Sequence, residues 1–154
     1  MTISFAATED VLEPGRTLEL ARAARVLYLR SGQVTASEDE DDTPLPLEEG
    51  VLFVGPLRLS GKGVVWGYEV GRDLAAPDPL RTVLRVTLSR DPDAPLLLRA
   101  DRVDFPAGAV TPRHGHAGPG IRRLLSGRLF AEIGPIHQRI DAGAAWFESG
   151  AEPV

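Results

Sequence analysis

Proline and glycine occur so often in this chain that long helices have little room to form. The sequence holds 13 prolines and 16 glycines among 154 residues. Proline removes a backbone donor and glycine lowers helix propensity, so both residues mark turns between short elements. Apolar runs with strand character lie between them, such as the run from Val83 to Leu88. The pattern predicts an all-β chain of short antiparallel strands.

One segment also fits a helix. The residues from Thr17 to Arg30 are rich in Ala, Arg and Leu, and they can be written as an amphipathic helix with good intrinsic propensity. An internal repeat favours strands instead, because 25–34 aligns with 121–129 and the second of these segments reads as strand and turn. We therefore expect strands over this segment.

The repeat divides the chain into two tandem modules. Ser31-Gly32 and Ser126-Gly127 both lie between apolar runs. Glycine tolerates the positive φ of tight turns, so each pair predicts a hairpin. Proline-rich segments separate the two copies, and we place the boundary near residue 76. The predicted modules are residues 1–76 and residues 77–154.

The charge pattern argues against a nucleic-acid partner. The formal net charge is -5 at pH 7, and the chain has no Lys/Arg run, whereas nucleic-acid binders cluster cations that face the phosphates. The densest charge is the acidic run from Glu38 to Asp42, which is typical of a solvated loop. A small-molecule ligand or substrate fits this composition better.

The chain shows no recognisable export or membrane signal. Its first residues lack a basic region and a long apolar region, and no later run is apolar for the roughly 18 residues that a membrane span requires. The sequence contains no Cys, so disulfides and thiolate metal sites are excluded. We expect a cytoplasmic protein that does not act at a membrane.

The chemistry is concentrated at His114-Gly115-His116. Side chains alternate with period two along a strand, so the two imidazoles would face the same side and could converge. Imidazole is a common ligand of first-row metals, and Fe, Mn, Ni, Zn or Cu would all fit. The remaining histidine, His137, lies on the next predicted strand. We take His114, His116 and His137 as candidate metal ligands.

The spacing around the histidine pair resembles the first motif of the cupin superfamily. Gly108 is followed after five residues by His114-Gly115-His116 and later by Gly127. The segment from Gly143 to Ser149 resembles the start of the second cupin motif. The resemblance covers residues 97–154, and 11–74 repeat it in degenerate form. It implies two tandem antiparallel β-barrels of the jelly-roll type, a bicupin layout, with a divalent metal inside on three His and one Glu.

The family pattern is incomplete in this chain. The position of the family Glu falls at Gly120, and that of the second-motif His falls at Val154. The first copy has Ala21 and Ala23 where the second copy has its histidine pair, so the first module is expected to be structural and metal-free.

The missing ligands must come from elsewhere. His137 or Glu148 could supply one if its side chain turns inward. In the alternative reading, the histidine pair lies in a pocket that holds no metal.

Arginines flank the predicted site at Arg113, Arg122 and Arg123. Alternation places Arg122 and Arg123 on opposite faces, so at most one of them lines the cavity. A guanidinium near the mouth of a barrel could pair with a carboxylate substrate.

The second module lacks a counterpart of the strand at 63–70 that closes the first one. Either the chain is truncated, which we favour, or an unpaired edge is left that another chain could pair with. In both cases we expect a homodimer.

These features lead to two hypotheses for function. In the first, a cupin-family protein binds a divalent metal through the histidine pair and binds or transforms a small polar or carboxylate-bearing molecule. An enzyme of this kind would be an oxygenase, isomerase or lyase, and no catalytic residue is assigned. In the second, a non-catalytic, metal-free cupin module binds or senses a small molecule.

Overall fold

The protein consists of two compact units, Met1–Asp101 and Arg102–Val154. The computed structural model describes residues 1–39, 42–72, 74, 76–91 and 94–154. Two residues of the predicted acidic loop, Glu40 and Asp41, lie outside the described residues. The division between the units lies C-terminal to the predicted boundary near residue 76, because β5 (Thr82–Ser89) pairs with β1 (Thr2–Leu12) of the first unit.

Every regular element in the described residues is a β-strand, and all strand pairs are antiparallel. The all-β prediction is therefore confirmed. The segment that also fits a helix belongs to β2 (Thr17–Ser37). The described part of the chain holds no helix of the length and apolar character needed to cross a bilayer.

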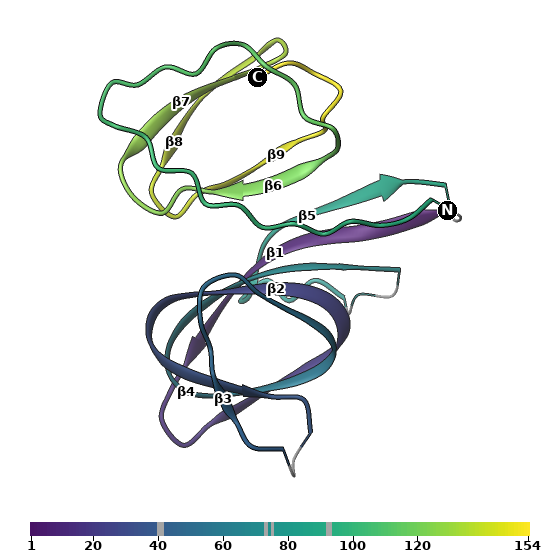
Figure 1. Ribbon diagram of the computed structural model, residues 1–154, viewed down its shortest axis with the longest axis vertical. Coiled ribbons are helices and arrows are strands. Elements are labelled where there is room, and N and C mark those ends of the chain that lie inside the picture. Colours follow the sequence, from purple (N-terminus) through teal and green to yellow (C-terminus); the bar gives the residue numbers. More distant parts are fainter. Residues whose placement is uncertain (40–41, 73, 75, 92–93) are drawn as a thin grey trace. The chain divides into compact units, whose positions relative to one another are not determined.

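The first unit is one sheet with the strand order β3-β2-β4-β1-β5, in which β3 is Leu45–Pro46 and β4 is Val51–Gly71. Both β2 and β4 are 21 residues long, which is longer than the short strands expected. The two strands pair with each other twice, since Ser60 lies opposite both Thr17 and Thr35. Each strand therefore bends until it has the other on both of its edges (Figure 1).

The predicted hairpin at Ser31-Gly32 is wrong, because both residues lie inside β2. Gly32 has φ 91° and lies opposite Gly63. A Cβ atom at Gly32 would lie 2.2 Å from the backbone oxygen of Lys62. The glycine therefore allows a close approach of two backbones inside the sheet.

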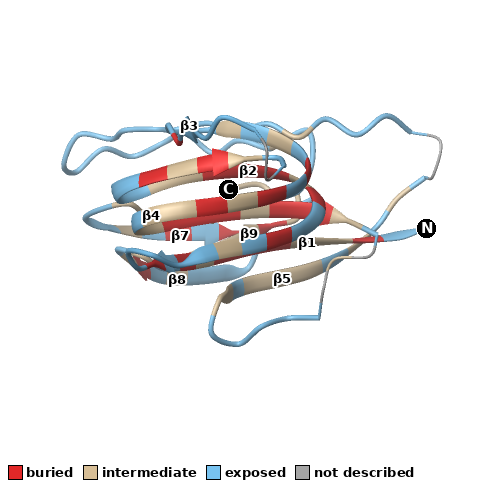
Figure 2. Ribbon diagram, turned by 90° about the horizontal axis from the view of Figure 1, so that it is seen from below, coloured by how far each residue is buried: buried red, intermediate tan, exposed pale blue. Residues whose placement is uncertain are grey.

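The apolar core of the first unit lies between the bent strands. Figure 2 shows buried residues along β1, β2 and β4. The core cluster consists of Leu12, Leu20, Leu27, Val34, Ala36, Leu47, Leu57, Leu59 and Val65.

A buried ion network also lies in the first unit. Arg25 is 1% exposed; its Nε lies 3.3 Å from Glu69 Oε1, and its Nη1 donates to the Gly55 carbonyl over 2.9 Å. Arg81 joins Asp10 to Glu69 at 2.6 and 3.1 Å. Burial lowers the pKa of Arg25, and Glu69 opposes this change. Two cations and two carboxylates thus compensate one another in a network that is buried except at Arg81, whose side chain is 23% exposed.

The second unit contains two strand pairs. Strand β6 (Gly120–Arg123) pairs with β9 (Ala145–Glu148), and β7 (Arg128–Ile133) pairs with β8 (Ile136–Asp141). Its small core consists of Ala131, Ile133 and Ile140, with Leu124, Leu129, Trp146 and Val154 packed against them.

The buried network predicts a strong response to loss of Arg25. We expect Arg25→Met to lower the free energy of unfolding by about 3–5 kcal/mol, because it removes a cation from a buried carboxylate. Arg58→Met is the control, because the side chains of Arg58 and its partner Glu19 are 28% and 66% exposed. This substitution should lower the free energy of unfolding by less than about 1 kcal/mol. Urea unfolding measures both changes, and equal losses would show that the network does not act as a buried unit.

Candidate functional site

The histidine pair lies on a segment without regular secondary structure, not on a strand. The backbone of His114 nevertheless exchanges two hydrogen bonds with Val154, each 2.8 Å long. Such a reciprocal exchange is the pattern of one antiparallel strand pair. Since Val154 also packs against the core of the second unit, its contact with His114 ties the histidine segment to that core.

A close backbone approach supports the same arrangement. Gly150 has φ 83°, and a Cβ atom there would lie 2.7 Å from the carbonyl carbon of Gly118. No side chain fits at Gly150 without displacing one of the two segments, so the backbones of Gly118 and Gly150 pass directly against each other.

The two imidazoles do lie together. The rings of His114 and His116 are 4.8 Å apart between centroids and meet edge to face at 81°. The Nδ1 atom of His114 lies 2.9 Å from the carbonyl oxygen of Pro112. Because a carbonyl only accepts, Nδ1 is the donor, and Nε2 of neutral His114 keeps its lone pair.

A buried carboxylate completes the cluster. The side chain of Glu148 on β9 is 4% exposed, and its Oε2 atom lies 3.1 Å from His116 Nε2 and 2.7 Å from Arg122 Nη2. Its Oε1 atom accepts a 2.7 Å hydrogen bond from Trp146 Nε1. The contact with Arg122 is an ion pair, whereas the contact with His116 is one only when the imidazole is protonated. Glu148, which the sequence offered as a ligand if it turned inward, does turn inward.

The register of β6 and β9 explains how this carboxylate reaches the site. Gly120, the position where the resemblance places the missing family Glu, lies directly opposite Glu148. Side chains of directly opposed residues lie on the same face of a strand pair. Glu148 therefore brings a carboxylate to the face and level where the motif lacks one. The pairing of β6 with β9 is the signal from which Glu148 could have been identified in the sequence.

Arg122 occupies the space above Gly120. A Cβ atom at Gly120 would lie 2.7 Å from Arg122 Nη1, so the absence of a side chain there makes room for the guanidinium. Arg123 instead donates from Nη2 to the Gly143 carbonyl over 3.0 Å. Arg113 is exposed. Arg122 is thus the arginine that reaches the cluster.

The charges in the cluster favour a neutral imidazole. Burial lowers the pKa of His116, and the positive charge of Arg122 lowers it further, while Glu148 opposes both effects. Burial also lowers the pKa of Arg122, again against the attraction of Glu148. His116 is consequently neutral at pH 7, which is the form that binds metals.

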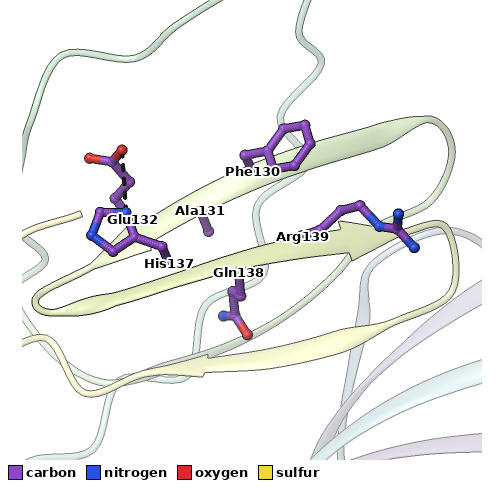
Figure 3. A pocket seen from close by; sticks show the side chains of 6 residues that line it. All are labelled: Phe130, Ala131, Glu132, His137, Gln138 and Arg139. Atoms are coloured by element: carbon purple, nitrogen blue, oxygen red, sulfur yellow. Dashed lines mark ion pairs between the residues drawn. The ribbon is translucent and has the colours of Figure 1, made fainter.

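The structure does not bring His137 together with this cluster. Its side chain on β8 is 69% exposed, and its Nδ1 atom lies 3.5 Å from Glu132 Oε1. It borders an open depression of about 340 Å³ on the strand pair β7–β8 (Figure 3). Ala131 and Gln138, which also line it, point away from the side of the strands that carries Glu132 and His137 (Figure 3).

The side chains are close to a metal site without forming one. No three His, Asp or Glu side chains are already arranged around a common metal position in the described residues. The structure instead brings two imidazoles and one carboxylate into neighbouring positions. Comparison with models of protein families, with curated proteins and with solved structures gives no match. The cupin resemblance therefore rests on the motif residues alone.

The environment of His116 predicts its titration. We expect a pKa below the ordinary value of 6.5, because burial and Arg122 oppose the charged form. A proton-detected NMR titration of the imidazole signals, assigned with His116→Asn, measures it. Because the unfolded state then binds the proton more readily, stability should fall as the pH drops below about 6.5, and His116→Asn should weaken that dependence. A midpoint above 6.5 would mean that Glu148 dominates.

The contact between Gly150 and Gly118 predicts a second difference. Gly150→Ala and Gly143→Ala both place Ala at a positive φ, which costs about 1–2 kcal/mol. Only Gly150 has backbone atoms in the way, since nothing lies within 4 Å of a Cβ atom at Gly143. We expect Gly150→Ala to destabilise the protein by about 1–3 kcal/mol more in urea unfolding. Equal losses would rule out the close approach.

Proposed function

We propose that the unit Arg102–Val154 is a cupin-type module that binds a divalent metal ion on His114, His116 and Glu148. In this proposal the module binds or transforms a small polar or carboxylate-bearing molecule at the same place. The observation that carries the proposal is the buried Glu148 carboxylate, which lies 3.1 Å from His116 Nε2. It approaches from the strand position opposite Gly120.

The donor set fits a first-row metal. Two imidazoles and one carboxylate form a set that leaves coordination positions open, as in non-heme iron sites, and each of these donors also suits Mn, Ni, Zn or Cu. His116 Nε2 and Glu148 Oε2 lie 3.1 Å apart, close enough to bind one ion together.

Two further features support a cation at Glu148. Its Oε2 atom is buried, and a carboxylate there needs a cation beside it. His114 lies beside His116 with an available Nε2 atom, and a side-chain rotation would bring in the third donor. When bound, the ion would act as a Lewis acid or bind dioxygen.

The alternative function is metal-free binding of a small molecule. The ion pair of 2.7 Å between Arg122 and Glu148 favours it, because the carboxylate already has a cation beside it. In this case Arg122, His114 and His116 would hydrogen-bond the ligand directly. The first unit, with Ala21 and Ala23 where the second has its histidines, would be structural under either function.

Metal content separates the two functions. We expect protein purified without a metal-affinity column to hold near-stoichiometric metal by elemental analysis, or to take it up from Zn²⁺ or Mn²⁺ in calorimetric titration. The double variant His114→Ala/His116→Ala and the single variant Glu148→Gln should each lose affinity by about 10- to 100-fold or more.

The matched control is His137→Ala, which removes an exposed imidazole of the same unit and should keep the metal. Metal far below stoichiometry in the saturated wild-type protein would overturn the metal site in favour of the metal-free function. Loss of metal in His137→Ala would instead show that the ligand set includes His137.

A further inference from the structure

We propose that Arg122 recognises a carboxylate ligand. In the absence of metal, Arg122 is paired with Glu148, and it becomes available to the ligand only when a divalent cation binds the Glu148 carboxylate. The carboxylate ligand and the cation would then bind cooperatively. This inference rests on the proposed metal site. It adds the class of the ligand and the link between metal binding and ligand binding.

Arg122 is placed where it can serve both roles. Its guanidinium lies over Gly120, and Nη2 reaches Glu148 Oε2 at 2.7 Å. Its side chain is 28% exposed, whereas that of Glu148 is 4% exposed. A ligand from solvent can therefore reach the guanidinium, while the carboxylate is accessible only from within the cluster.

The proposed cation and Arg122 require the same atom. Oε2 of Glu148 is the atom nearest to both His116 Nε2 and Arg122 Nη2. A dication bound there would repel the guanidinium and withdraw the negative charge that now compensates it. Arg122 would then be a partly buried cation without a carboxylate partner, which is an unfavourable state.

A carboxylate is the anion that best restores the balance. The guanidinium presents a planar fork of donors that matches the two oxygens of a carboxylate. Arg122 is the guanidinium that reaches the cluster, since Arg123 extends from the opposite face of β6. A single guanidinium beside a metal suits a small carboxylate better than a highly charged phosphate.

The experiment is a calorimetric titration with succinate, with and without saturating Zn²⁺. We expect the wild-type protein to bind succinate about tenfold or more tightly with Zn²⁺, and succinate to tighten Zn²⁺ binding by the same factor. Glu148→Gln frees Arg122 and should bind succinate without Zn²⁺, to within several-fold of the loaded wild-type protein. Arg122→Gln should bind Zn²⁺ at least as tightly as wild type and gain no affinity for succinate.

The control is Arg139→Gln, which removes an exposed guanidinium that pairs with Asp141, and it should behave as wild type. Circular dichroism and urea unfolding test whether each variant is folded. If Glu148→Gln does not fold, Arg122→Lys replaces it as the test. This variant should retain part of the Zn²⁺-dependent gain in succinate affinity that Arg122→Gln loses.

The outcomes separate the two proposals. Absence of Zn²⁺ binding in the wild-type protein overturns the proposed metal site. Zn²⁺ binding with no change in succinate affinity overturns this inference alone. A full Zn²⁺-dependent gain in Arg122→Gln also overturns it, because the metal would then hold the carboxylate without the arginine.

Discussion

Burial of the Glu148 carboxylate is the interaction around which the second unit is organised. A carboxylate that is 4% exposed is unfavourable unless cations and donors surround it. Trp146 supplies the donor to Oε1, and Arg122 supplies the cation to Oε2. Both residues come from the same face of the strand pair β6–β9, because Arg122 lies opposite Trp146 and Gly120 lies opposite Glu148. The need to compensate one charge therefore determines what the neighbouring positions must provide.

The first unit meets the same requirement in a different way. Glu69 and Asp10 are compensated by Arg25 and Arg81, and the two cations match the two carboxylates. Arg25 also donates to the backbone at Gly55. A network of this kind has charge balance and no imidazole, so it has no evident affinity for another cation. At Glu148, by contrast, an imidazole lies 3.1 Å from the carboxylate. The difference in partners separates a structural ion network from a candidate binding site.

The sequence predicts the all-β class of the fold better than the path of the strands. Frequent Gly and Pro indicate short strands, yet β2 and β4 are long, because their bends occur within the strands and Gly32 lies at a close approach between them. Local turn signals cannot distinguish these two uses of glycine.

The site shows the same division between local and non-local information. The rings of His114 and His116 do lie together, although the strand alternation from which we predicted this is absent at these residues. The choice between His137 and Glu148 depended on pairing between segments distant in sequence. Gly120 meets Glu148 only through the register of β6 and β9, and His114 meets Val154 through two backbone hydrogen bonds. A strand register is set by all side chains of both strands together, so neither contact follows from a motif.

The two functions considered for this site differ in which cation compensates Glu148. With Arg122 in place, the charges of the guanidinium and the carboxylate cancel, and His116 is neutral. Such a cluster has little attraction for an anion. With a dication at Oε2, the ion, Glu148 and Arg122 together would carry two net positive charges, and the guanidinium would be free to turn toward solvent. A site of this charge favours a carboxylate ligand, so metal binding and ligand selectivity would follow from the same change of partner at a single buried oxygen atom.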